Sequence, residues 1–299
     1  MTWTDCVPEP RLTRDGSFSL FSEAFAEGFH SADGALTEAR EKFVTPAELH
    51  RFPPGRQLVV VEVAVGTGTN TACLLEAVAA GGLRLRWWGL ELDPEPLALA
   101  LGDPRFRRQW PDPVLEQLEA LRSSEGMLWG DARQSLAVPL AEAPGRCDLV
   151  LLDAFSPQRC PQLWSVEFLC ALARLLSPEG RLLTYCAAAA VRRGLQLAGL
   201  QLAAISTGEE RPGARRWCLG TVASPSPLPP SRWLRPLSPM EREHLATRAA
   251  EPYRDPSGCA APEEILVARA RAQASSAAAS SSAWRRRWAI GRPGAAEHR

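Results

Sequence analysis

Between residues 58 and 223, short apolar runs alternate with longer segments whose apolar residues recur at helical spacing. The short runs are apolar throughout, which is typical of strands covered on both faces by helices. Expected strands occupy 58–64, 83–92, 126–131, 147–155 and 180–187, and expected helices occupy 70–80, a stretch from 94, 161–176 and 190–200. A final hairpin is expected over 200–207 and 215–223. The alternation predicts an α/β fold with a doubly wound, Rossmann-like sheet, mostly parallel and ending in a C-terminal antiparallel hairpin.

The pattern changes on both sides of this stretch, which predicts three parts: a leading segment 1–57, a core 58–223 and a tail 224–299. The tail opens on a Pro/Ser linker, "SPSPLPPSRW", and later holds a Ser/Ala run that we expect to be weakly structured. Near its end lies "WRRRW" (284–288), which combines cations with aromatics. Such a stretch fits nucleic-acid binding or docking on the core, and docking is the interpretation we favour.

Charge is uneven along the chain although the formal net charge is zero. Residues 223–299 carry 12 Arg and 7 Asp or Glu, about +5, which leaves about −5 on residues 1–222. A basic tail on an acidic body is compatible with a polyanionic partner. It is equally compatible with a solvated tail in an Arg-rich chain, in which Lys42 is the only lysine.

Several function classes find little support in the composition. No apolar run approaches the roughly 20 residues of a membrane span, and the N-terminus lacks the order of a signal peptide, so we expect a cytoplasmic protein without a membrane partner. The eight cysteines form no Cys-x-x-Cys pair and the four histidines have no ligand spacing. Reduced, mostly buried thiols and no metal site are therefore expected.

A glycine loop follows the first expected strand in "EVAVGTGTN" (62–70). Gly66 and Gly68 allow a sharp turn and a close approach of the backbone to a ligand at a helix N-terminus. A dinucleotide site favours a third glycine where this chain has Thr71, whereas S-adenosylmethionine sites commonly use a looser Gly-x-Gly loop. A plain tight turn is the remaining interpretation.

Acids end the next two expected strands. Glu91, in "GLELD", lies where a carboxylate accepts both ribose hydroxyls of a bound nucleoside, while Asp93 is better placed to cap the following helix. Asp131, in "WGDA", is placed to receive an adenine amino group. Together these acids favour S-adenosylmethionine, although each could be an ordinary strand terminus.

The fourth expected strand runs into "LLDAFSPQRCPQLW" (151–164). Ligands of open α/β sheets lie beyond the carboxyl ends of the strands, so Asp153 is expected in the same crevice as Gly66 and Glu91. A carboxylate beside a methyl donor suits a nitrogen nucleophile, because an alkylammonium needs an acceptor for its proton. Phe155 and the prolines would wall the crevice. Capping of the helix at 161 is the alternative, but Asp153 lies far upstream of it.

These motifs resemble the methyltransferase domain of a known family, the bifunctional tRNA 5-methylaminomethyl-2-thiouridine biosynthesis proteins (MnmC). The resemblance rests on the Asp-x-Phe-x-Pro loop with a Trp after it, and on "VRRGL" (191–195). It also rests on "SEAFAEGFHSADGALTEAREKFV" (22–44), on "VGTGTN" and on "RPGARRWCLG" (211–220), in colinear order over about 14–222. The departures are Val65 for an aromatic, Thr69 for Leu, and three alanines at 188–190.

The resemblance implies an S-adenosylmethionine-dependent methyltransferase sheet that transfers methyl to the aminomethyl nitrogen of 5-aminomethyl-(2-thio)uridine at the tRNA wobble position. It implies Asp153 as the catalytic acid–base residue and the segment 1–57 as a cover over the crevice. The implied cofactor residues are Gly66, Thr67, Gly68, Asn70, Glu91, Asp131 and Ala132. The substrate residues that we expect are Phe29, His30, Glu38, Phe155, Pro157, Arg192, Arg193 and Arg215.

The tRNA phosphates would meet the arginines, which position RNA without reading its sequence, and a splayed-out base would stack on Phe29 or Phe155. Trp164 is a further stacking candidate, for which we favour core packing instead. Residues 223–299 cannot supply the FAD-dependent oxidase half of the family, so we expect a stand-alone methyltransferase that depends on a separate oxidase or pathway enzyme for its aminomethyl substrate. Three alternatives stay open: an N-methyltransferase for a small amine, a catalytically silent nucleotide- or RNA-binding protein, and an aminopropyl transferase like the polyamine synthases.

Overall fold

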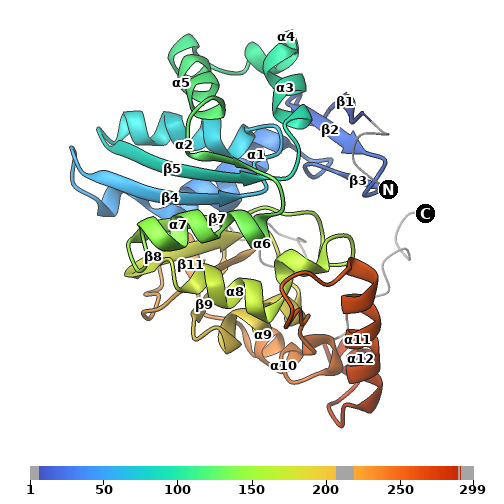
Figure 1. Ribbon diagram of the computed structural model, residues 1–299. Helices are drawn as coiled ribbons and strands as arrows, with labels where there is room; N and C mark the ends of the chain where they lie inside the picture. Colours follow the sequence, from blue (N-terminus) through green and yellow to red (C-terminus); the bar gives the residue numbers. More distant parts are fainter. Residues whose placement is uncertain (1–6, 207–218, 289, 291–299) are drawn as a thin grey trace, which may run out of the picture.

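An eight-stranded sheet forms the centre of the molecule in the computed structural model, which describes residues 7–206, 219–288 and 290 (Figure 1). The strand order is β11-β9-β10-β8-β7-β4-β5-β6. The bounds are β4 Gln57–Val63, β5 Arg84–Glu91, β6 Met127–Trp129, β7 Cys147–Leu152, β8 Leu176–Thr184, β9 Gln201–Ile205, β10 Thr221–Ser224 and β11 Leu234–Arg235. Strands β4 to β8 are parallel, and β10 pairs antiparallel with both β8 and β9. The mostly parallel sheet and its C-terminal antiparallel hairpin are confirmed.

Helices cover both faces of this sheet (Figure 1). One face carries α2 (Thr69–Ala80), α3 (Glu95–Gly102), α4 (Pro104–Arg107) and α5 (Asp112–Arg122), and the other carries α6 (Ala132–Ser135), α7 (Ala137–Glu142), α8 (Val166–Ala173) and α9 (Ala189–Leu197). Strand β4 shows why. Its residues Leu58 and Val60 pack into the hydrophobic core on one face of the sheet, and Val61 and Val63 pack into the core on the other face. Apolar residues at consecutive positions therefore feed two separate cores, as the unbroken apolar run predicts.

The crossover after β7 is less regular than the expected helix over 161–176. A short 3-10 turn, η5 (Pro161–Trp164), comes first, and α8 starts only after Ser165, whose Oγ accepts the Phe168 N–H at 3.2 Å. Serine at this position caps α8 because it satisfies an N–H that has no partner within the helix. Strand β8 likewise begins at Leu176, four residues before the expected 180.

The leading segment forms a small antiparallel sheet of β1 (Glu9–Leu12), β2 (Phe18–Ser22) and β3 (Glu27–Gly28). Helix α1 (Ala35–Ala39) follows and continues as a π-helical turn, η2 (Arg40–Val44), and two 3-10 turns, η3 (Thr45–Ala47) and η4 (Leu49–Arg51). Phe18 packs edge-on against Phe106 of α4, with ring centroids 5.8 Å apart. This contact joins the small sheet to the helices beside the carboxyl ends of β4 and β5.

The tail is folded as far as residue 288. It comprises β11, α10 (Pro239–His244), the 3-10 turn η6 (Arg248–Ala250), α11 (Pro262–Ser275) and α12 (Ser281–Arg287). Trp284 is 2% exposed, stacks on His244 with ring centroids 3.9 Å apart and donates its indole N–H to the Met240 carbonyl at 3.0 Å. The first tryptophan of "WRRRW" thus docks α12 on α10. No helix in the described part of the chain is long and apolar enough to cross a membrane.

Candidate cofactor and substrate site

A cavity of about 460 Å³ lies at the carboxyl ends of β4, β5, β6 and β7. This is the place where an open parallel sheet binds its ligand, because helix N-termini and loops converge there. One end of the cavity is lined by the glycine loop and the acids of β5 and β6, and the other by Asp153 and by residues of the leading segment. The sheet therefore brings the four sequence motifs to one cavity.

The glycine loop makes its turn through three left-handed residues. Ala64, Gly66 and Gly68 have φ angles of 63°, 56° and 78°. A side chain on Gly68 would meet Leu97 Cδ1 at 2.8 Å, so both space and backbone angle require glycine there. Ala64 holds a conformation that is costly for a residue with a Cβ, and such strain gathers at functional sites. Gly66, Thr67 and Asn70 line the cavity, whereas Gly68 does not.

Glu91 ties the end of β5 to this loop. Its carboxylate accepts the N–H groups of Gly66 at 2.8 Å, Leu92 at 2.6 Å and Asp93 at 3.3 Å. Burial raises the pKa of Glu91 and outweighs these three hydrogen bonds, which favour the charged form. The side chain lines the cavity, and a carboxylate with three donors still has lone-pair capacity for a ribose hydroxyl.

Asp131 and Ala132 line the cavity beside Gly130, at the end of β6. The Asp131 carboxylate caps α6 by accepting the backbone N–H of Arg133 at 2.9 Å. Both of its oxygens also accept bonds from the guanidinium of Arg133: Nε donates to Oδ1 at 3.1 Å and Nη2 donates to Oδ2 at 2.7 Å. A bidentate ion pair of this kind fixes the plane of the carboxylate.

Asp153 directly follows the last residue of β7, and its side chain lines the cavity. Asn70 Nδ2 donates to Asp153 Oδ2 at 2.6 Å, which connects the strand end directly to the first turn of α2. Burial, followed by the negative charge of Glu38, raises the pKa of Asp153 well above its ordinary value. A raised pKa means a higher proton affinity, which makes the ionised carboxylate a stronger general base.

The π-helical turn brings a cation to the same place. Lys42 Nζ forms an ion pair with Glu38, and the two side chains are 17% and 9% exposed. Although burial opposes ionisation of Glu38, Lys42 and the Ser31 N–H hold the pKa of Glu38 below its ordinary value. Lys42 also lies 5.8 Å from the ring centroid of Tyr185, whose hydroxyl donates to the Ala154 carbonyl at 3.0 Å.

Aromatic rings wall the Asp153 end of the cavity. Phe155 stacks on Phe25 with centroids 4.6 Å apart and meets Phe29 edge-on at 5.0 Å. The loop that carries Phe155 is tied to the leading segment, since Ser156 Oγ donates to Glu27 Oε2 at 2.8 Å. Cys160 is buried and its thiol donates to the Phe155 carbonyl, so it helps to shape this loop.

The other predicted site residues have mixed positions. His30 lines the cavity, its Nδ1 lies 2.9 Å from Ser19 Oγ, and burial lowers its pKa to about 4, so the ring is neutral at pH 7. Pro157 is buried but does not line the cavity. Trp164 is fully buried and donates its indole N–H to the Phe155 carbonyl, as core packing requires.

The predicted phosphate contact of Arg192 is contradicted. Arg192 is 3% exposed and its guanidinium binds Glu241 of α10 at 3.0 Å and Thr221 Oγ1 at 3.0 Å. Arg192 lies on the face of α9 that α10 of the tail covers, which is why its side chain is buried. Arg193 is exposed on α9 but does not line the cavity, and Arg215 lies outside the described residues.

Sequence reasoning missed Lys42, Tyr185, Phe25 and Glu27 as cavity residues. Lys42 had a signal, because it is the only lysine in a chain with 34 Lys and Arg, and lysine and arginine are not interchangeable at specific sites. The other three carry no local signal. In the described part of the chain, no three His, Cys, Asp or Glu side chains are arranged to hold a metal ion.

Sequence and structure comparisons show which known proteins this chain resembles. Residues 106–222 match the family of S-adenosyl-L-methionine-dependent methyltransferases. The bifunctional MnmC protein of Azoarcus sp. (strain BH72), named for tRNA 5-methylaminomethyl-2-thiouridine biosynthesis, is 32% identical over 71% of this chain and 36% of its own length. The protein of the same name from Pseudomonas syringae pv. tomato is 28% identical over 85% of this chain and 41% of its own.

Among solved structures, MNMC2 from Aquifex aeolicus is similar with a TM-score of 0.71 and 27% identity, over 88% of this chain and 83% of that chain. The chain spans about a third of the length of the curated relatives that it matches. The chain is thus an MnmC-like, S-adenosyl-L-methionine-dependent methyltransferase.

Proposed function

We propose that this protein methylates the aminomethyl nitrogen of 5-aminomethyl-(2-thio)uridine at the wobble position of tRNA. The observation that carries the proposal is Asp153, a carboxylate of raised pKa in the same cavity as the glycine loop and Glu91. The names of the relatives, which refer to 5-methylaminomethyl-2-thiouridine in tRNA, support the substrate. A separate enzyme would supply the aminomethyl uridine.

The cavity fits the cofactor. Left-handed Gly66 and Gly68 bring the backbone against the cavity, and the cofactor-side acids Glu91 and Asp131 both line it. Asn70 Oδ1 is buried without a hydrogen-bond partner in the protein, so a ligand donor there would relieve a cost of about 1–3 kcal/mol. When bound, S-adenosylmethionine supplies an electrophilic methyl group on a positively charged sulfur. Thr67 and Ala132 complete the wall on this side.

Asp153 acts on the proton of the substrate amine. An alkylammonium has no free lone pair at neutral pH, so the nitrogen becomes a nucleophile only after an acceptor takes a proton from it. The hydrogen bond from Asn70 holds Asp153 Oδ2 and leaves Oδ1 for the amine. The negative charges of Asp153 and Glu38 also attract the cationic amine, while Lys42 limits the net charge of the pocket.

The aromatic rings Phe25, Phe29 and Phe155 suit a splayed-out pyrimidine. A modified base must leave the anticodon stack to reach a cavity of this size, and aromatic side chains replace the stacking that it loses. The cover formed by the leading segment closes on this end, because Glu27 of β3 binds the Phe155 loop. It excludes water from the amine once the base has entered.

The test is nucleoside mass spectrometry of tRNA after incubation with the protein and methyl-labelled S-adenosylmethionine. The expected result is label on the aminomethyl nitrogen of the wobble uridine, with tRNA binding that weakens steeply as salt rises. Label on a free small amine alone would show that the substrate is a small amine and not tRNA. Cofactor and tRNA binding without any methyl transfer would indicate a catalytically silent binding protein, and transfer of an aminopropyl group would indicate a polyamine-synthase-like activity.

A further inference from the structure

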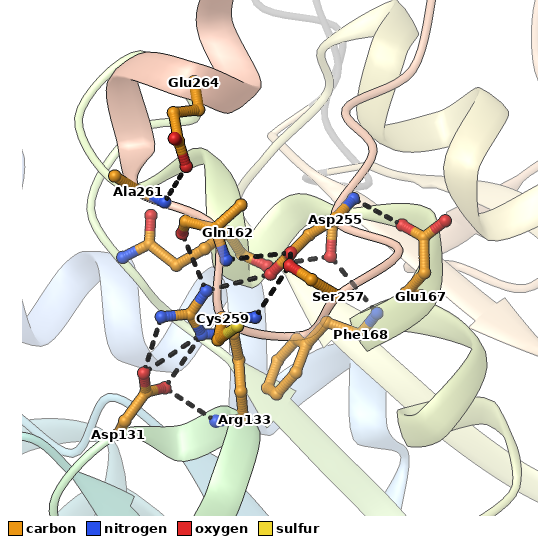
Figure 2. A network of polar contacts seen from close by, with 12 residues as sticks. Asp131, Arg133, Gln162, Glu167, Phe168, Asp255, Ser257, Cys259, Ala261 and Glu264 are labelled. Carbon is orange, nitrogen blue, oxygen red and sulfur yellow. Dashed lines mark hydrogen bonds and ion pairs between the residues drawn. The ribbon is translucent and has the colours of Figure 1, made fainter. Parts of the chain in front are cut away.

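The C-terminal loop, residues 251–261, contacts Arg133 of α6, next to the cavity residue Asp131 (Figure 2). Asp255 of this loop is 1% exposed, and its Oδ2 accepts a bond from Arg133 Nη1 at 2.9 Å. Arg133 Nη1 also donates to the Ala260 carbonyl at 3.0 Å, so two groups of the loop hold this guanidinium. The other edge of the same guanidinium holds Asp131, as described above.

The loop is built to keep Asp255 ionised and fixed. Asp255 Oδ1 accepts the hydroxyl of Ser257 at 2.9 Å and the Ala260 N–H at 3.1 Å, and the backbone N–H of Asp255 donates to Glu167 of α8 at 2.7 Å. Burial works against ionisation, but these bonds and that from Arg133 outweigh it, and the pKa of Asp255 stays below its ordinary value. The guanidinium therefore has a carboxylate on each side.

This arrangement gives Arg133 a definite orientation. A planar guanidinium that is pinned at Nη1 by one carboxylate presents Nε and Nη2 in a fixed direction, and Asp131 takes both. Asp131 in turn lines the cavity, where the proposed cofactor site places the adenine amino group. Figure 2 shows the series from Asp131 through Arg133 to Asp255 in one view.

We infer that Asp255 and Arg133 are positioning residues for adenine recognition, so that part of the cofactor site is built by the tail and not by the methyltransferase core. The inference rests on the proposed function of Asp131. It states that the C-terminal loop sets the affinity for the adenine amino group through Arg133 and Asp131, without touching the ligand itself.

The test measures binding of two ligands to the full chain by calorimetry: S-adenosylhomocysteine, and its analogue with hydrogen in place of the adenine 6-amino group. The wild-type protein should bind the analogue about tenfold more weakly, since a charged acceptor loses its donor. Asp255→Asn should weaken S-adenosylhomocysteine about fivefold and leave the analogue within about twofold. Arg133→Lys, which keeps the charge but lacks the two-pronged geometry, should act in the same direction.

The matched control is Arg254→Gln, on the neighbouring residue of the same loop. Arg254 binds Glu167 at 2.8 Å with 56% of its side chain exposed, and within the described part of the chain it forms no hydrogen bond or ion pair with Arg133 or Asp131. Its substitution should leave both ligands unchanged. An equal loss for both ligands in Asp255→Asn would show a general structural role, and no loss for either would show no role; each result overturns the inference and leaves the proposed function intact.

A second measurement needs no variant. Because coupling between two sites is reciprocal, S-adenosylhomocysteine should slow amide exchange in 251–261 of the wild-type protein more than the analogue does. Equal protection by the two ligands would contradict the inference. Failure of the wild-type protein to bind either ligand would overturn the proposed function together with the inference.

Discussion

The leading segment and the C-terminal loop both support an acid of the same cavity, but they do so from opposite sides. The leading segment places its own charged and aromatic side chains, Glu38, Lys42 and Phe25, in the cavity wall beside Asp153. The C-terminal loop places none there, and reaches Asp131 only through Arg133. We therefore expect the leading segment to act on the chemistry and the C-terminal loop to act only on geometry.

Because of this difference, we expect substitutions in the two regions to change different measured quantities. Charges that face the substrate change the proton affinity of Asp153, so their loss is expected in rates and pH profiles. Groups that act through an intermediate arginine change how well a ligand is held, so their loss is expected in affinities. The predictions below test this separation, in order of decreasing effect.

Asp153→Asn should remove the proton acceptor while keeping the shape of the cavity. Methyl transfer should fall by about 10²–10⁴-fold, the usual contribution of a general base, and affinity for S-adenosylhomocysteine should stay unchanged. Single-turnover transfer to tRNA and calorimetry measure the two quantities. An unchanged rate would show that Asp153 is not the proton acceptor, and would leave the Asp153 end of the cavity without a chemical role.

Arg192→Met should test how firmly the tail is attached to the core. Glu241 also pairs with Arg235 at 2.6 Å, so removal of Arg192 should lower the free energy of unfolding by about 1–3 kcal/mol, the cost of losing one charged hydrogen-bond partner at a buried site. The control is the adjacent, exposed Arg193→Met, for which a change below about 0.5 kcal/mol is expected. Urea unfolding measures both variants. Equal small losses would show that the tail contributes little to core stability.

Glu38→Gln should shift the pH dependence of methyl transfer. In the proposed mechanism Asp153 accepts a proton in its ionised form, so activity should rise with pH through its pKa, which burial and the charge of Glu38 hold above the ordinary value. Without that charge the pKa of Asp153 falls, and the acidic limb of the profile for kcat/KM moves to lower pH. Glu142→Gln, an exposed pair partner of Arg86, is the control. An acidic limb that stays in place would show that Glu38 and Asp153 do not interact.

Phe25→Leu should have the smallest effect. The Phe25–Phe155 stack contributes about 0.5–1.5 kcal/mol beyond its buried area, so KM for tRNA should rise up to about tenfold while affinity for S-adenosylhomocysteine stays constant. Steady-state kinetics with tRNA provides the measurement. A loss of affinity for S-adenosylhomocysteine instead would show that Phe25 supports the cofactor site and not the substrate site.

Much of this architecture could be predicted from the sequence because its causes are local. Consecutive apolar residues in β4 predict a strand between two cores, and Gly66 and Gly68 predict the sharp turn after it. Since parallel strands all present their carboxyl ends at one edge, Glu91, Asp131 and Asp153 could be assigned to one crevice from their positions alone.

What the sequence did not predict depends on contacts between distant segments. Arg192 resembles a surface residue until Glu241, 49 positions later, is placed beside it. Asp255 and Arg133 are 122 positions apart, and neither lies in a sequence motif that would indicate their contact. Lys42 faces the cavity because α1 continues into a π-helical turn, a change of helix type that apolar spacing does not reveal.

The single lysine also gives this protein a built-in reporter. An amine-reactive reagent has two kinds of target in the chain, the terminal α-amino group and Lys42, and the second lies in the wall of the cavity. The mass of one peptide therefore reports on occupancy of the substrate side, without a substitution and without an attached dye. Ligands that fill the Asp153 end will slow acylation of Lys42, whereas ligands confined to the Asp131 end will leave it reactive.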